Sequence, residues 1–148
     1  MDAKRFATGT IVGGIVLFFT GYLIFELAFG SFYTANVGSA SGVAREPFLF
    51  WAIAVASLSY AALIVFTLGN QSGPLTIGRG ALVGAIVGFL MWMTADFVIY
   101  GISHVANLTR TIVDPVLELV HGGLAGAAIA AVLSRSAGRQ RAPAPASV

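Results

Sequence analysis

The chain has 148 residues, of which 57% are hydrophobic and 9% are charged. Because soluble globular domains carry about 25% charged residues, this surface cannot be kept in water, and a water-soluble enzyme is excluded. The net charge of +2 rests on few basic residues beside apolar blocks and does not indicate a nucleic-acid partner. Cysteine is absent, which excludes disulfides, thiolate metal sites and cysteine nucleophiles.

The first two apolar blocks are residues 6–29 and 48–68, joined by a predicted loop of small residues, 30–46. As a helix, each is long enough to cross a hydrocarbon core of about 30 Å at about 1.5 Å per residue. The first block is too long for a signal-peptide core of about 7–15 residues, so we expect it to be a membrane span. Pro47 is expected in the first turn of the second helix, where its missing N–H is not needed.

Two further blocks of this length are residues 80–102 and 115–133. A short polar loop, 103–113, separates them, so we expect the two helices to pack as an antiparallel hairpin. The dipeptide Asp114-Pro115 is typical of a helix start, with aspartate as the N-cap and proline at the first helical position. The sequence therefore predicts an all-α fold, a bundle of four transmembrane helices within the lipid bilayer.

The bundle is predicted as a single domain, 1–133, followed by a disordered cytoplasmic tail rich in arginine, alanine and proline, 134–148. Lysine and arginine are enriched on the cytoplasmic side of membrane spans. With four spans, a cytoplasmic N-terminus leaves only Arg45 and Arg110 outside. We therefore expect both termini in the cytoplasm, together with the other basic residues: Lys4, Arg5, Arg79, Arg135, Arg139 and Arg141.

Small residues recur at every fourth position in several spans. Lipid tails are as apolar as leucine, so membrane helices associate through close backbone packing, which such rows allow. The rows fit either ordinary packing within one bundle or, for one of them, contact with a second copy of the chain. The predicted helix-packing positions are Gly13, Gly21, Gly84, Gly88, Gly122 and Gly126.

Polar and ionisable side chains gather in the predicted outer half of the bundle. Residues four apart lie on one side of a helix, so Asp96 shares a face with Gly84 and Gly88. Glu118 likewise shares a face with Gly122. An ionised carboxylate facing lipid costs at least about 2.5 kcal/mol, so these groups are expected to face the interior and are functional candidates by default. The predicted polar intramembrane cluster is Glu26, Asp96, Tyr100, His104, Glu118 and His121.

A purely structural role is open for two of these carboxylates. Glu26 and Glu118 lie close to the membrane surface, where they reach water or pair with the two outer arginines. Glu118 also lies in the first turn of its predicted helix, where a carboxylate meets the positive end of the helix dipole. Asp96 is deeper and has no local cation, which makes it the strongest single candidate for a role beyond packing.

Two functional interpretations also stay open. Glu118 and His121 are spaced as in carboxylate di-metal bundles, so the first is a divalent metal site. Its ligands would come from the predicted cluster: Glu26, Asp96, Glu118 and His121, with His104 as a further candidate. In the second interpretation, Asp96 or Glu26 exchanges protons or binds a cation without a cofactor.

Catalytic templates are missing from the sequence: there is no nucleophile elbow, no H-E-x-x-H motif and no phosphate-binding loop. We therefore expect a non-enzymatic accessory or assembly subunit that associates with itself, as a homo-oligomer, or with a larger membrane complex. The alternative is a small proton- or cation-coupled transporter, or a metal-binding membrane protein, that uses the polar cluster. A water-filled cavity reaching Asp96 would favour transport, and a closed glycine-packed interior would favour the structural role.

Four stretches carry a resemblance to known proteins: KRFATGTIVGGIVLFFTGYLIF, REPFLFWAIA, GALVGAIVGFLMWMTADFVIYG and DPVLELVHGGLAGAAIAAVL. In their basic start and glycine-rich spans they resemble the uncharacterised small four-span integral membrane proteins of bacteria. The resemblance covers most of the chain and implies four spans in the bacterial inner membrane. It implies no activity, because such families mostly have none assigned.

Overall fold

The computed structural model describes residues 1–140, with side chains through Arg135, and this part of the chain is helical. Its strand-like pairing is limited to one bridge between Val37 and Ala106. The all-α prediction is confirmed. The helices are α1 (Ala3–Gly21), the π-helical segment η1 (Tyr22–Ala28), α2 (Gly30–Ala35), α3 (Phe50–Gly69), α4 (Ile77–Ile102) and α5 (Leu108–Gln140).

Large apolar side chains cover the outside of the molecule. Phe19, Trp51 and Leu82 are 63%, 69% and 61% exposed. Such a surface is unfavourable in water and is suited to lipid tails. Four helices are long and apolar enough to cross a membrane, which is compatible with a small multi-pass membrane protein: Ala3–Ala28, Phe50–Gly69, Ile77–Ile102 and Leu108–Arg135.

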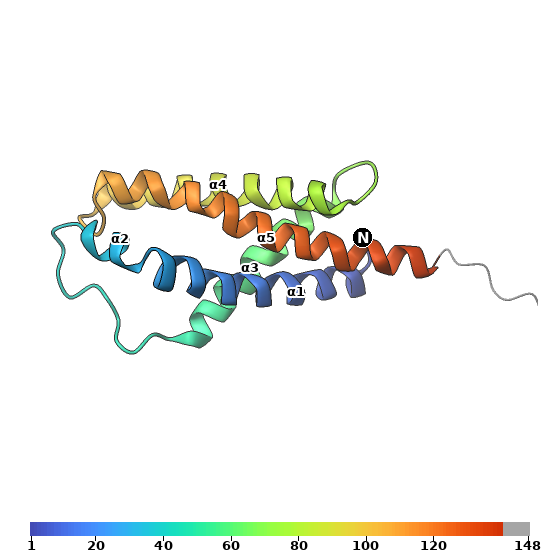
Figure 1. Ribbon diagram of the computed structural model, residues 1–148, viewed down its shortest axis with the longest axis horizontal. Helices are drawn as coiled ribbons and strands as arrows, with labels where there is room; N and C mark the ends of the chain where they lie inside the picture. Colours follow the sequence, from blue (N-terminus) through green and yellow to red (C-terminus); the bar gives the residue numbers. More distant parts are fainter. Residues whose placement is uncertain (141–148) are drawn as a thin grey trace, which may run out of the picture.

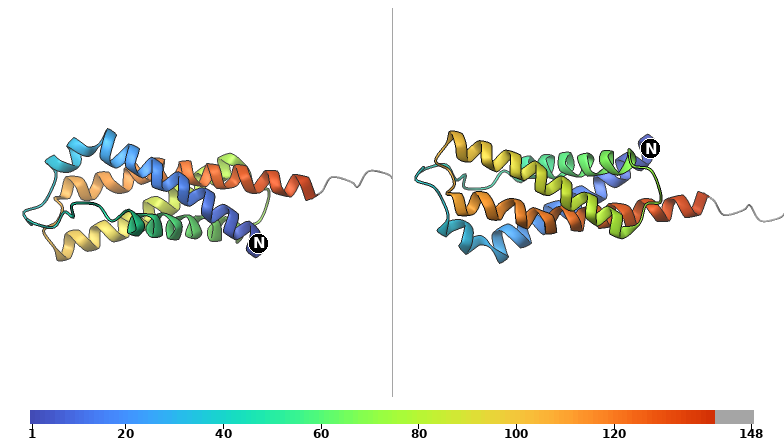
Figure 2. Two further views of the ribbon diagram at one scale, coloured as in Figure 1. Left: turned by 90° about the horizontal axis from the view of Figure 1, so that it is seen from below. Right: turned by 90° about the horizontal axis from the view of Figure 1, so that it is seen from above.

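Both ends of the described chain lie at the same end of the molecule (Figure 1, Figure 2). The turn that joins α3 to α4 is also at this end. The long segment between α2 and α3 and the short one between α4 and α5 lie at the opposite end, which we call the loop end. An even number of crossing helices produces this arrangement.

The last helix begins earlier than predicted. Asn107 rather than Asp114 lies at its start, where the side-chain Oδ1 of Asn107 accepts a hydrogen bond of 2.9 Å from the backbone N–H of Arg110. Pro115 lies inside the helix, so the prediction that Asp114-Pro115 starts it is wrong. Proline removes one hydrogen bond there, a loss that packed neighbours in a membrane protein compensate. Asp114 is consequently an interior helix residue and is 8% exposed.

Other helix boundaries also differ from the prediction. Pro47 precedes α3 instead of lying in its first turn, and the peptide bond between Glu46 and Pro47 is cis. The predicted loop after the first span contains α2. α5 continues through 134–140, because a helix already formed extends at little cost until a breaking residue is reached. The rest of the predicted disordered tail, 141–148, lies outside the described residues.

α4 and α5 form the most extensive helix contact, and they run antiparallel (Figure 1). Glycine faces glycine across it: Gly80 meets Gly126, and Gly84 meets Gly122. A Cβ atom added to any of these four would come closer than 3.0 Å to a backbone carbonyl of the other helix. The predicted hairpin is therefore confirmed, and its backbones approach so closely that only glycine fits.

The glycines of α1 also pack inside the chain. A Cβ added at Gly13 would lie 2.6 Å from Cδ1 of Ile129 in α5 and 3.0 Å from Cβ of Ala61 in α3. The glycine rows of α1, α4 and α5 all contact other helices of the same chain. This supports the interpretation that they serve packing within one bundle rather than contact with a second copy. The apolar core between these helices includes Leu17, Ile64, Val65, Ala125, Ile129 and Leu133.

Candidate functional site

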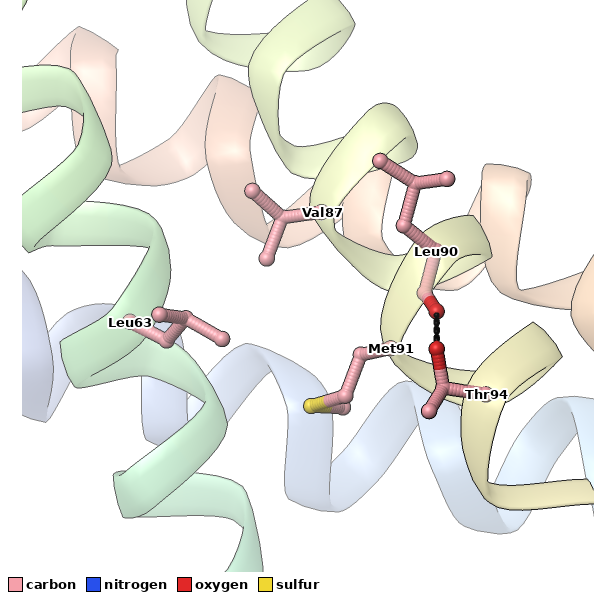
Figure 3. A pocket seen from close by; sticks show the side chains of 5 residues that line it. All are labelled: Leu63, Val87, Leu90, Met91 and Thr94. Atoms are coloured by element: carbon pink, nitrogen blue, oxygen red, sulfur yellow. Dashed lines mark hydrogen bonds between the residues drawn. The ribbon is translucent and has the colours of Figure 1, made fainter. Parts of the chain in front are cut away.

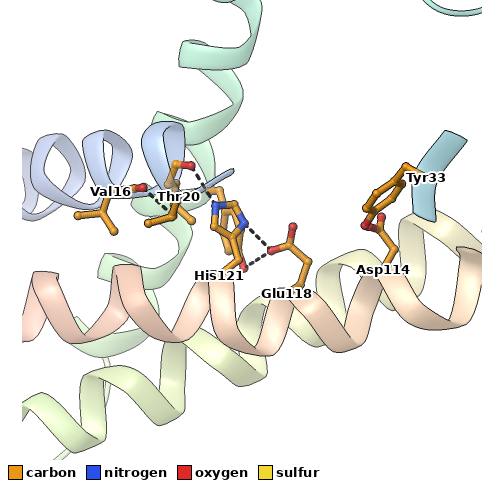
Figure 4. Close-up of polar contacts among 8 residues, drawn as sticks. Val16, Thr20, Tyr33, Asp114, Glu118 and His121 are labelled. Carbon is orange, nitrogen blue, oxygen red and sulfur yellow. Dashed lines mark hydrogen bonds and ion pairs between the residues drawn. The ribbon is translucent and has the colours of Figure 1, made fainter. Parts of the chain in front are cut away.

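A carboxylate and an imidazole meet in the interior of the bundle. Glu118 and His121 lie one turn apart on α5, and Oε2 of Glu118 is 3.0 Å from Nδ1 of His121 (Figure 4). Glu118 is 2% exposed and His121 is 7% exposed. Two titratable groups are thus paired away from both lipid and water.

Two neighbouring helices complete the hydrogen bonds of this pair. The hydroxyl of Tyr60 in α3 donates to Oε2 of Glu118 at 3.2 Å. Nε2 of His121 lies 3.0 Å from the carbonyl oxygen of Leu17 in α1. The rings of Phe25 and Tyr60 pack edge-on against the imidazole, with centroid distances of 5.3 and 6.0 Å. Side chains and backbone from α1, η1, α3 and α5 therefore fix the position of the pair.

The contact with Leu17 determines where one proton of the site lies. A carbonyl oxygen only accepts, so Nε2 of His121 carries a proton and donates it. Nδ1 then faces Glu118 either as a donor to the carboxylate or as an acceptor from the carboxylic acid. In both forms one further proton lies between the two side chains. The pair is therefore neutral in sum and holds one exchangeable proton.

A second pair of carboxyl groups lies closer to the loop end. Asp114 of α5 and Asp96 of α4 lie close enough to interact electrostatically, and two neighbouring carboxyl groups can share a proton. Asp96 also interacts electrostatically with Glu118. Oδ2 of Asp96 and Nε1 of Trp92 are buried without a hydrogen-bond partner among the described residues. We call Asp114, Asp96 and Glu118 the carboxyl row.

Tyr33 of α2 covers the end of the carboxyl row. Its hydroxyl donates to Oδ1 of Asp114 (Figure 4), and the guanidinium of Arg110 lies 4.9 Å from the centre of its ring. Burial and the contact with Asp114 raise the pKa of Tyr33 above its ordinary value, although the charge of Arg110 opposes the shift. Tyr33 therefore stays a neutral hydrogen-bond donor at physiological pH.

The structure brings only part of the predicted polar cluster together. Glu26, Tyr100 and His104 are exposed and lie apart from the site. Glu26 belongs to η1 and lies four residues after Tyr22, which is itself exposed. The face that these two residues share therefore points away from the bundle. The predicted members that meet are Asp96, Glu118 and His121.

Three residues of the site were not among the predicted ones: Asp114, Tyr33 and Tyr60. Asp114 continues the four-residue spacing of Glu118 and Gly122, which is the signal that would have placed it on the buried face. Its interpretation as an N-cap concealed this spacing. Tyr33 lies in a segment predicted to be a loop, where no periodicity exists to place it.

The described residues contain no group of three or more histidine, aspartate or glutamate side chains arranged to hold a metal ion. Of the proposed metal ligands, Glu26 is exposed on η1. Asp96 lies near Asp114, and Glu118 is hydrogen-bonded to His121. The donors are thus divided between two places in the bundle, and this arrangement suits proton binding better than metal coordination.

An open apolar groove lies apart from these polar pairs, between α3 and α4 (Figure 3). Its one side-chain hydroxyl, that of Thr94, donates to the carbonyl of Leu90 at 2.8 Å, so the groove suits lipid tails rather than a polar ligand. The groove has a volume of about 430 Å³ and is lined by Leu63, Val87, Leu90, Met91 and Thr94.

Comparison with known proteins assigns no family to this geometry. No protein-family model matches the chain, and neither a curated protein nor a solved structure matches it. The fold alone therefore defines the class: a helical chain compatible with a small multi-pass membrane protein.

Proposed function

We propose that this chain is a small proton-coupled membrane transport protein that binds and releases a proton at the Glu118–His121 pair. The observation that carries the proposal is the burial of Glu118 within an apolar span, in contact with His121. Ionisable groups inside membranes are costly and mark proton relays and ion pathways. Gly13 of α1 already packs closely on Ile129 of α5 and on Ala61 of α3, so the pair is not needed to join these helices.

The rest of the carboxyl row supports the proposal because it extends from the pair toward the loop end. Asp114 precedes Glu118 by one turn of α5, about 6 Å along the helix axis. Asp96 joins the row from α4. Glu118, one turn deeper on α5, is therefore placed to accept a proton that Asp96 and Asp114 share. A charge that moves between these groups stays inside the protein and does not cross lipid.

Nitrogen NMR of isotope-labelled histidine tests the proposal, because His104→Gln leaves His121 as the sole histidine. In lipid nanodiscs, the spectrum reports protonation of Nδ1 and Nε2 separately. We expect Nε2 to stay protonated and the Nδ1 signal to change as the pH is varied. Glu118→Gln keeps the shape of the side chain but removes the exchangeable proton, so this change should disappear. If the Nδ1 signal of the chain that keeps Glu118 did not change with pH, the proposal would be overturned.

A second candidate function is that of a non-enzymatic accessory or assembly subunit. The glycine-packed contact between α4 and α5 favours it, since such an interior is closed. In this role Glu118 and His121 would join α5 to its neighbours and keep one protonation state. A homo-oligomer or larger complex would then form through the exposed apolar faces. The constant Nδ1 signal that overturns proton exchange would support this second candidate.

We further propose that both termini face the cytoplasm of a bacterial cell, because six of the eight basic residues then lie inside. The lack of native cysteine makes single introduced cysteines specific reporters. Ser39→Cys, at the loop end, should react with an impermeant maleimide in intact cells. Ser72→Cys, between α3 and α4, should react only after permeabilisation. The opposite pattern would show the reverse orientation in the membrane.

A further inference from the structure

The segment after α1 closes the loop end of the carboxyl row. α2 brings Tyr33 to this position, with its hydroxyl on Asp114 (Figure 4). The guanidinium of Arg110 lies over the ring of Tyr33. α2 contains no buried residue. It is therefore fixed by these polar contacts and by the chain that follows it rather than by an apolar core.

A short backbone clasp, formed by 36–40 against 104–107, ties this segment to the start of α5. The N–H of Gly38 donates to a carbonyl of the facing segment at 3.0 Å. The side-chain amide of Asn107 also donates to Oδ1 of Asn36 at 3.1 Å. These bonds bury no core residue, and segments held in this way open at low free energy. The clasp is accordingly a weaker contact than the glycine packing of α4 on α5.

η1 connects α2 to α1 and has the features of a hinge. π-helical segments are rare and are found frequently at functional sites. η1 contains no buried residue, so its bending leaves the apolar core intact. It begins directly after Gly21, which lies against the imidazole of His121. The hinge thus adjoins the proton-binding pair.

We propose that α2 is a lid on the carboxyl row, closed by Tyr33 on Asp114, and that it lifts about η1 to admit water. This inference rests on the proposed proton binding at the Glu118–His121 pair and identifies the route by which protons reach that pair. With the lid closed, Asp114 is 8% exposed. The charged and titratable groups around Asp114 are Tyr33 of α2, Asp96 of α4, and Arg110, Glu118 and His121 of α5.

Removal of the Tyr33 hydroxyl tests the closed contact. The protein in nanodiscs is treated with a water-soluble carbodiimide and an amine, and labelling of Asp114 is followed by peptide mass spectrometry. Tyr33→Phe keeps the ring but loses the hydrogen bond, so labelling should be about two- to tenfold faster than in the unchanged chain. Tyr22→Phe, which alters an exposed tyrosine of η1, is the matched control and should not change the rate.

Locking the clasp tests the motion independently of Tyr33. Val37 and Ala106 form a bridge flanked by hydrogen bonds on both sides, a pairing with about 4.5 Å between Cα atoms that a disulfide can span. In the Val37→Cys/Ala106→Cys chain, oxidation should abolish labelling of Asp114, and reduction should restore it. A disulfide that does not form, or labelling that neither variant changes, would overturn the lid. The histidine spectrum tests proton binding and the labelling of Asp114 tests the lid. Either proposal can therefore be overturned while the other is supported.

Discussion

Replacing Gly84 by leucine is expected to separate α4 from α5 and to prevent recovery of folded protein. Even the single Cβ of Gly84→Ala would approach the carbonyl oxygen of Gly122 closer than 3.0 Å. Overpacking costs about 1–3 kcal/mol when side chains must move, and here the obstacle is backbone, which cannot rotate aside. We therefore expect Gly84→Ala to lower the free energy of unfolding by about 2 kcal/mol or more, measured by circular dichroism during reversible unfolding in mixed micelles.

Gly101→Ala is the matched control in the same helix, because a Cβ added there meets nothing within 4 Å. Alanine is the better helix former by about 0.8–1.0 kcal/mol, so this variant should be as stable as the unchanged chain or slightly more stable. If Gly84→Ala and Gly101→Ala unfolded alike, the backbones of α4 and α5 would not be in contact.

Glu118→Ala is expected to have the largest effect of any polar substitution. It leaves Nδ1 of His121 and the hydroxyl of Tyr60 buried without their hydrogen-bond partner. Each buried polar group left unsatisfied costs about 1–3 kcal/mol, and His121→Ala should cost an amount comparable to Glu118→Ala. The double variant should cost clearly less than the sum, because the second change removes the group that the first left unpaired. The same unfolding series measures all three variants.

Glu26→Ala is the control for this cycle, since Glu26 is an exposed carboxylate on η1. Its effect on the free energy of unfolding should stay within about 0.5 kcal/mol. A loss for Glu118→Ala no greater than that for Glu26→Ala would show that Glu118 is not buried, and the site would have to be abandoned.

The all-helical fold and its four long apolar helices are predictable from sequence, because long apolar runs favour the helix, which satisfies its backbone groups internally. The hairpin of α4 and α5 is predictable too, since glycine at four-residue spacing permits the observed approach of Gly84 to Gly122. The helix ends are harder to predict. Asp114-Pro115 has the composition of a helix start, but membrane helices tolerate an interior proline, so the dipeptide is less informative here than in water.

Within the candidate site, the residues on regular helices are the ones that periodicity locates. Glu118 lies one turn from Gly122 and therefore on the packed face of α5. Glu26 follows the same four-residue spacing, but it shares a face with the exposed Tyr22 and therefore points away from the bundle. Tyr33 reaches Asp114 from α2, a short helix that follows the break at Phe29. Its position is set by contacts between distant segments, which a local pattern does not contain.

The bond between His121 and the carbonyl of Leu17 joins α5 to α1, which precedes it along the chain. Chains are made from the N-terminus, so α5 inserts after α1 and α3 are in place. An acidic residue at the centre of a lone span costs about 2.5–3.5 kcal/mol during insertion. Tyr60 and the Leu17 carbonyl precede Glu118 and His121 into the bilayer and offer them hydrogen bonds on arrival. The order of the helices along the chain thus shortens the time for which the most polar span is exposed to lipid without partners.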